Sequence, residues 1–420
     1  MKILFGSGLL FSLISVTAFA NPNLQRTDLP PSQVVSKILD ESPAVQSANS
    51  GIDLGKANKR RLEAGPYEFN ASLLGQRRKV GNAQGRLNEW AVEVERSFRS
   101  PGKGNIDSDI GDAGLDAANF AYRDAYHEAA RLFLSQWFSW VKTKYDVEQW
   151  EAQAASLAEQ RRIVARREKL GDAAQLEFSM VEGASAQADA ALQQARARFQ
   201  IATSVLTQSY PSLELPKIVT IVDPEPIIGS LELWRSQILE DDHNLLRAKA
   251  ETLQANLQSK RARLDLIPDP TIGVQFGSEQ GGNERYVGLR LTIPFPASTI
   301  RSANSDAALA QASITRQREA QITRDLLNNI DVGYVTAVSG YGSWQSAKLA
   351  KNSIEKNATK MARAYDLGEV GLMELLAAQR LRAETNLTFN ATLIEAVEAR
   401  YRLLLDSHQL WLPRGEEGKH

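Results

Sequence analysis

Strict alternation between apolar and polar residues occurs at two places in each half of the chain. The alternating segments are residues 69–73, 90–95, 272–276 and 287–293. A period of two predicts half-buried β-strands, and the Gly281-Gly282-Asn283 turn joins the second pair as a hairpin. We therefore expect two β-hairpins, over residues 67–98 and 270–295. The connector 75–89 is so polar and glycine-rich that we predict it to be an exposed loop.

One face of these predicted strands is apolar throughout. It is formed by Phe69, Leu73, Trp90, Val92, Val94, Ile272, Val274, Phe276, Val287, Leu289 and Leu291. The opposite face carries Glu93, Glu95, Gln275 and Arg290. This is the pattern of a barrel with lipid outside and water inside. Four strands are too few to close into a barrel on their own. Closure would need strands from other copies of the chain, and three copies supply twelve strands. A small soluble sandwich with one solvated face fits the same alternation strand by strand.

Most of the remaining chain has helical periodicity. Helices are expected over residues 32–64 with a break at Pro43, and over 107–170, 172–209, 231–265, 299–367 and from there to 411. Some 60 helical residues reach roughly 90 Å, so the longest helices must lean on other long helices. The predicted fold class is mainly α with a small β part.

The second half of the chain repeats the first at an offset of 197 positions. The offset places Arg166 on Arg363, Leu170 on Leu367, Gly171 on Gly368, Glu177 on Glu374, and Phe98 on Phe295. A fixed internal period indicates duplication. We assign a first repeat to 21–208, a proline-rich linker to 209–230, a second repeat to 231–411 and a flexible tail to 412–420, with the helical hairpins turning near 171 and 368.

Composition limits the possible functions. Residues 1–20 have the lysine, apolar run and small-x-small ending of a cleaved secretory signal. The chain has no Cys, four His in no ligand spacing and a formal charge of -1. We expect no metal site, no cofactor, no nucleic-acid partner and no enzymatic activity. No later stretch has the roughly 20 apolar residues of a membrane-spanning helix.

Together, the paired hairpins, the long helices and the repeated Leu-Gly segments resemble the TolC-like family of outer-membrane efflux channels. The resemblance covers nearly the whole mature chain. It implies a homotrimer with a twelve-stranded barrel in outer-membrane lipid and a helical tunnel reaching into the periplasm. It also implies docking to a periplasmic adaptor protein and an inner-membrane pump.

The same resemblance assigns roles to the glycine segments. Leu170, Gly171, Leu367 and Gly368 become the adaptor-docking tips at the periplasmic end. A missing side chain at each glycine lets a partner helix approach the backbone. Plain helix capping is an alternative role, and both can hold together.

Three further residues are implied as the periplasmic entrance. Glu177 and Glu374 would form carboxylate rings that attract cations, and Tyr365 matches an aromatic that helps to hold the tip closed. Val370 and Ala377 stand where some relatives have a basic and a second acidic residue, which leaves the closing network open. Glu177 and Glu374 also fit ordinary solvated helix positions.

The segments 97–103 and 294–296 are similar to the cobalt-zinc-cadmium branch of the family, which works with pumps of the resistance-nodulation-division class. That similarity implies export of divalent heavy-metal cations. A conduit needs no metal ligands of its own, because the pump can select. The rival from another class is a periplasmic coiled-coil adaptor or scaffold, which would have one helical hairpin flanked by β domains.

Overall fold

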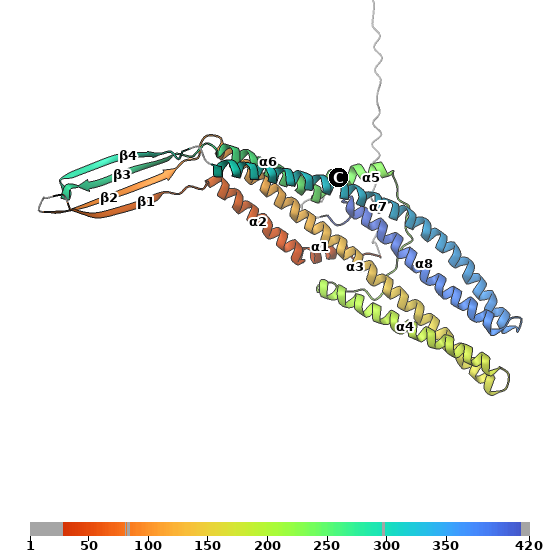
Figure 1. Ribbon diagram of the computed structural model, residues 1–420. Coiled ribbons are helices and arrows are strands. Elements are labelled where there is room, and N and C mark those ends of the chain that lie inside the picture. Colours follow the sequence, from red (N-terminus) through yellow and green to blue (C-terminus); the bar gives the residue numbers. More distant parts are fainter. Residues whose placement is uncertain (1–27, 80, 82–84, 296–298, 413–420) are drawn as a thin grey trace, which may run out of the picture.

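The molecule is elongated, with four strands at one end and paired helices reaching the other (Figure 1). The structure, a computed structural model, describes residues 28–79, 81, 85–295 and 299–412. The predicted signal sequence 1–20 and residues 413–420 of the predicted tail lie outside the described residues. The predicted mainly helical fold with a small β part is confirmed.

Both halves have the same order of elements. The first contains α1 (Ser32–Asp40), α2 (Pro43–Ala64), β1 (Asn70–Lys79), β2 (Arg86–Ser97), α3 (Lys103–Lys169) and α4 (Gln175–Ser209). The second contains α5 (Leu231–Asp241), α6 (His243–Leu264), β3 (Thr271–Glu279), the short η1 (Gln280–Gly282), β4 (Glu284–Thr292), α7 (Thr299–Asp366) and α8 (Leu372–Asp406). Helices α3 and α7 have 67 and 68 residues, and each is roughly 100 Å long. Within the described part of the chain, no helix is both long and apolar enough to cross a membrane.

Two predicted boundaries were wrong. The connector 75–89 is not all loop, because β1 continues to Lys79 and β2 begins at Arg86. Its polar side chains pair across the strands, as Gln76 donates to Glu89 at 2.7 Å, so the polar residues here belong to the ladder and do not mark its end. The single helix predicted over 231–265 is divided at Asp242, whose carboxylate accepts a hydrogen bond from the Leu245 amide at 2.8 Å and caps α6.

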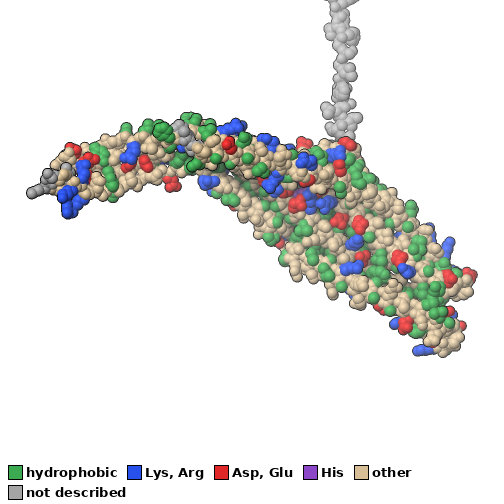
Figure 2. Space-filling model, in the orientation of Figure 1, with side chains coloured by type: hydrophobic (Ala, Val, Ile, Leu, Met, Phe, Trp, Pro, Cys, Tyr) green, Lys and Arg blue, Asp and Glu red, His purple; other side chains and the backbone are tan. Residues whose placement is uncertain are grey.

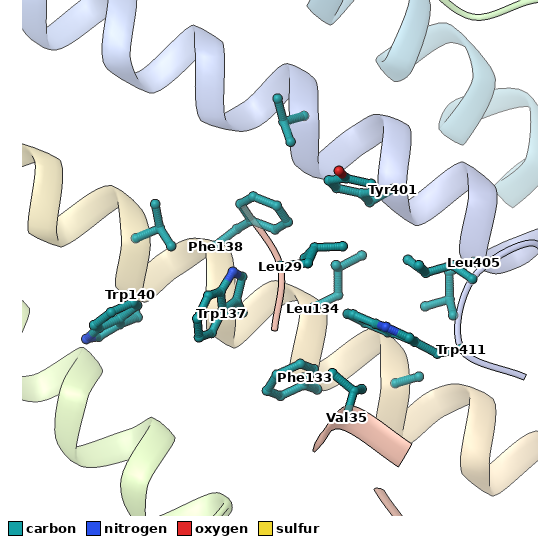
Figure 3. Packing of buried hydrophobic residues seen from close by; sticks show 14 of the residues in the cluster. Leu29, Val35, Phe133, Leu134, Trp137, Phe138, Trp140, Tyr401, Leu405 and Trp411 are labelled. Atoms are coloured by element: carbon teal, nitrogen blue, oxygen red, sulfur yellow. The ribbon is translucent and has the colours of Figure 1, made fainter. Parts of the chain in front are cut away.

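The main hydrophobic core is an aromatic cluster midway along the helices (Figure 3). The ring of Phe133 in α3 lies 5.0 Å from that of Tyr210 and 5.5 Å from that of Trp411, between centroids. Trp137 is fully buried, and its Nε1 donates to the carbonyl of Asp28 at 2.8 Å. The two ends of the described chain therefore meet on α3.

A buried ion cluster joins the helices to the sheet. Asp269, just before β3, accepts hydrogen bonds from the Lys103 ammonium at 2.8 Å, the Tyr67 hydroxyl at 2.7 Å and the Ser100 amide at 2.8 Å. Lys103 is 2% exposed and also donates to the carbonyl of Ile267. Burial alone would raise the pKa of Asp269, but these donors hold it well below its usual range. The same site, through burial and then Asp269, raises the pKa of Tyr67 to about 12.

We expect Asp269→Ala to destabilise the protein by about 3 to 5 kcal/mol, because it removes the buried partner of the Lys103 ammonium. Asp53→Ala is the matched control, since Asp53 pairs with Lys56 on the exposed surface of α2 and should cost less than about 1 kcal/mol. Denaturant midpoints followed by tryptophan fluorescence measure both. Equal midpoints for the two variants would contradict a structural role for the cluster.

Candidate functional site

The four strands form one antiparallel sheet in the order β1-β2-β3-β4. Its register places the apolar residues predicted to face lipid on a single side, which we call the apolar face. Two of its rows run Leu73, Val92, Phe276, Val287 and Ala71, Val94, Val274, Leu289. Ile272 and Leu291 pair in the next row, toward the helices. Whether this face contacts lipid stays a prediction.

Large apolar side chains of this sheet are exposed. On the apolar face, Leu73 is 78% and Leu289 84% exposed, whereas Glu89 on the other side is 5% exposed. Large exposed apolar surfaces mark sites of contact with protein or membrane. The sheet thus leaves much of its hydrocarbon exposed. On the other side Glu89 is buried, whereas Arg78, Arg290, Glu279 and Glu284 are exposed.

The other side, which we call the polar face, carries charges of both signs, some of them in ion pairs. The Arg78 guanidinium lies 2.6 Å from the Glu89 carboxylate, and that of Arg290 lies 3.0 Å from Glu93. Strand residues on this face contribute five carboxylates (Glu89, Glu93, Glu95, Glu279, Glu284) and two guanidinium groups (Arg78, Arg290), a net charge of -3.

At the far end of the molecule, α3–α4 and α7–α8 turn in the same way (Figure 1). Gly171 and Gly368 have φ values of 77° and 76°, a left-handed conformation that favours glycine. The Asp172 amide donates to the carbonyl of Arg167 and the Glu369 amide to that of Ala364, both at 2.8 Å. Both turns are Schellman motifs, so the repeat extends to individual backbone hydrogen bonds.

Exposed apolar side chains flank each glycine. Leu170 is 75% and Leu367 64% exposed. Sequence reasoning missed a second pair at the same offset, Leu176 and Met373, which are also exposed. The repeat itself was the signal that could have found them. We call the four residues Leu170, Leu176, Leu367 and Met373 the tip patches.

The three predicted entrance residues lie close to these turns, but in different settings. Glu177 is half-buried and Glu374 is exposed. Each lies in the first turn of its helix, α4 or α8, where a carboxylate interacts favourably with the helix dipole. Arg167 donates to the Tyr365 hydroxyl at 3.1 Å and so links the two hairpins. A buried hydrophobic cluster next to these residues contains Val164, Val181, Leu372 and Leu375. A gating role for Glu177, Glu374 and Tyr365 stays a prediction.

Three of the four histidines come together near the middle of the helices. Ring centroids of His243 and His408 are 4.5 Å apart, and those of His127 and His408 are 5.2 Å apart. Burial, with smaller effects of His408 and Arg123, lowers the pKa of His243 to about 3, and burial also lowers that of His127 well below its usual value. Among the described residues, no set of His, Asp and Glu is arranged to hold a metal ion. We interpret the cluster as structural.

Comparison with solved structures identifies the architecture. The outer membrane channel CmeC of Campylobacter jejuni superimposes with a TM-score of 0.77 at 14% identity, over 91% of this chain and 86% of that one. The outer membrane protein VceC of Vibrio cholerae gives 0.75 at 14% identity, over 90% and 96%.

The chain has the fold of the outer membrane channels. Residues 234–410, within the second half, match the family model described as outer membrane efflux protein. A search of curated proteins found no matching sequence.

The histidine cluster should make stability depend on pH. His243 is neutral in the folded protein down to about pH 3, whereas in the unfolded chain it gains a proton near pH 6.5. The unfolded state therefore binds more protons between these values, and stability is full above about pH 6.5 and falls on acidification below it. The limiting slope is about 1.4 kcal/mol per pH unit for each such histidine.

Unfolding temperatures between pH 7.5 and 4.5 measure this slope, and His243→Leu should make it shallower. Thr252→Val, a change at a buried and non-ionisable residue of the same helix, should leave the slope unchanged. A His243→Leu variant with the wild-type slope would contradict the assignment.

Proposed function

We propose that the chain is the outer-membrane exit duct of a tripartite efflux system. The observation that carries this proposal is the sheet, with exposed hydrocarbon on one face and a net charge of -3 on the other. Such a sheet suits a wall between lipid and water. The fold shared with outer membrane channels and the partial match to the efflux family model support the same function.

The sheet edges support a homotrimer. Strands β1 and β4 each have one neighbour within the chain, and unpaired edges are not tolerated in hydrocarbon. Pairing β1 of one copy with β4 of the next in a ring of three gives twelve strands. The helices then extend from the membrane into the periplasm as a tunnel. Secretion by the predicted signal 1–20 and the domain boundaries given above are part of the same proposal.

The tip patches are proposed to dock the periplasmic adaptor, which connects the duct to an inner-membrane pump. Each patch offers exposed leucine or methionine beside a glycine turn, a surface suited to helix packing. A periplasmic adaptor or scaffold, the rival function, would have one helical hairpin flanked by β domains. The described residues form two helical hairpins and one sheet, which favours the channel.

The charge of the polar face supports a cationic cargo. Three copies would surround the barrel interior with nine net negative charges, which raises the local concentration of cations. We propose divalent heavy-metal cations as substrates, driven by a pump of the resistance-nodulation-division class, with selection made by the pump. Glu177 and Glu374 would add carboxylates at the entrance.

Single-channel conductance in planar bilayers tests the channel and its entrance. We expect stepwise, cation-selective conductance from the purified trimer. In Glu177→Gln with Glu374→Gln, the permeability ratio for cations over anions should fall several-fold, because two carboxylates per copy leave the entrance. Glu214→Gln, in the exposed linker, should keep wild-type selectivity.

Unchanged selectivity in the double variant would contradict the role of Glu177 and Glu374 at the entrance, but not the channel function. A mature protein that is soluble without detergent and does not insert would discard the channel itself.

The tip patches can be tested separately. Replacing Leu170 and Leu367 by Ser should remove about 1.5 to 3 kcal/mol per side chain from docking, a loss of roughly ten-fold or more in affinity. Conductance should persist, while cellular accumulation of the exported metal rises. Ile218→Ser, equally exposed in the linker, is the control. Normal export by the tip variant would contradict docking at these residues.

A further inference from the structure

The two faces of the sheet differ in the sign of their charges as well as in polarity. Every charged strand residue on the apolar face is a cation, namely Arg77, Lys79, Arg86, Arg96 and Arg285, and every strand carboxylate lies on the polar face. The strands carry seven cations and five carboxylates, and the two cations on the polar face, Arg78 and Arg290, are ion-paired with Glu89 and Glu93. The separation calls for an explanation of its own.

Three of these cations gather at the free end of the sheet, away from the helices. Lys79 pairs directly with Arg86, and Arg77 pairs with Asn88 one row closer to the apolar band. Figure 2 shows basic side chains gathered at this end of the molecule. Trp90 and Arg285 lie in the row between this group and the apolar residues. We call Arg77, Lys79 and Arg86 the basic triad.

The triad has no counter-ion within the described residues. Arg78, the intervening residue on the opposite face, pairs with Glu89, whereas no carboxylate of the described chain forms an ion pair with Arg77, Lys79 or Arg86. Residues 80–85, which join the two strands, contain no acidic residue in the sequence. Like charges directly opposite on one face are destabilising, so the Lys79–Arg86 pair favours an anion beside it.

Strand β4 of a second copy supplies no anion on this face. In the proposed trimer the neighbour of β1 is β4 of another copy, and the β4 residues on the apolar face are Arg285, Val287, Leu289 and Leu291. None carries a carboxylate, whatever the register between copies. The partner strand adds a further cation instead.

In the proposed barrel, the spacing along the strand would place the triad at a membrane surface. Arg96, at the helical end of the apolar face, lies between Phe69 and Phe98, at 4.9 and 6.0 Å from the ring centroids. From Arg96 to Asn88, the partner of Arg77, there are eight residue steps, which is roughly 27 Å along the strand. At a tilt of about 40° this gives roughly 20 Å of height, near the ~25 Å band of outer-membrane barrels. Cations thus flank the apolar band at both ends.

We propose that Arg77, Lys79 and Arg86 bind the phosphate groups of lipid in the outer leaflet of the outer membrane. This inference rests on the proposed function, because it needs the sheet to stand in a bilayer with its free end outward. Guanidinium groups bind phosphate through paired hydrogen bonds, and the ammonium adds a point charge. The probe with matching chemistry is lipid A, a glycolipid that carries two phosphate groups at the hydrocarbon boundary.

The test compares lipid binding by the full-length trimer and a variant with Arg77→Gln, Lys79→Gln and Arg86→Gln. Binding of bis-phosphorylated lipid A, followed by native mass spectrometry in detergent, should be roughly 100-fold weaker in the variant. The charge-matched control replaces Lys249, Lys260 and Lys356 by Gln, which are exposed on α6 and α7, and should bind as the wild type does. Arg77→Lys with Arg86→Lys should retain most of the binding.

Three outcomes would overturn the inference. They are equal binding by the triad variant and the wild type, equal binding of lipid A and its dephosphorylated form, and displacement of lipid by millimolar inorganic phosphate, which would indicate a site for free phosphate. Planar-bilayer conductance of the same preparations separates this from the proposed function. Conductance without phosphate-dependent lipid binding refutes only the lipid site, whereas absence of conductance in the wild type refutes the channel.

Discussion

The attachment of the sheet to the helices depends on the buried carboxylate of Asp269. Its hydrogen bonds reach the segments before β1, after β2 and at the start of α3, so one side chain holds most of the crossings between helix and strand. Beside it, Asp107 binds both Arg99, at 2.9 Å, and Arg261, at 2.6 Å. Because these ions are partly or fully shielded from water, the junction is fixed, and the apolar face and the tip patches stand at opposite ends of one body (Figure 1).

The two repeats agree in backbone and differ in side-chain chemistry. Both tips close with the same Schellman hydrogen bonds, and both place a glutamate in the first turn of the returning helix. Only the first tip has Arg167, which bonds both Asp172 and the Tyr365 hydroxyl of the second tip. At the equivalent position the second tip has Ala364, so any motion that separates the hairpins breaks a contact contributed by one repeat alone.

Local patterns were sufficient for much of this structure. Alternation identified all four strands and their apolar face, and the glycines at 171 and 368 identified both turns, because each is a property of neighbouring residues. The strand ends at Lys79 and Arg86 were missed, since their pairing depends on contacts across the hairpin. The approach of His127, His243 and His408 was also beyond sequence reasoning, because residues so far apart meet only through tertiary packing. The basic triad could be recognised only from the strand register, because the register decides on which face of the sheet each cation lies.

The aromatic core has a consequence for how the chain is made. It includes Leu29 and Trp411, which lie near opposite ends of the described residues (Figure 3). Synthesis proceeds from the N-terminus, so Leu29 is made long before Trp411 and must wait for it. Contacts of such high sequence separation form slowly. The core can therefore close only after the segment that carries Trp411 has been made.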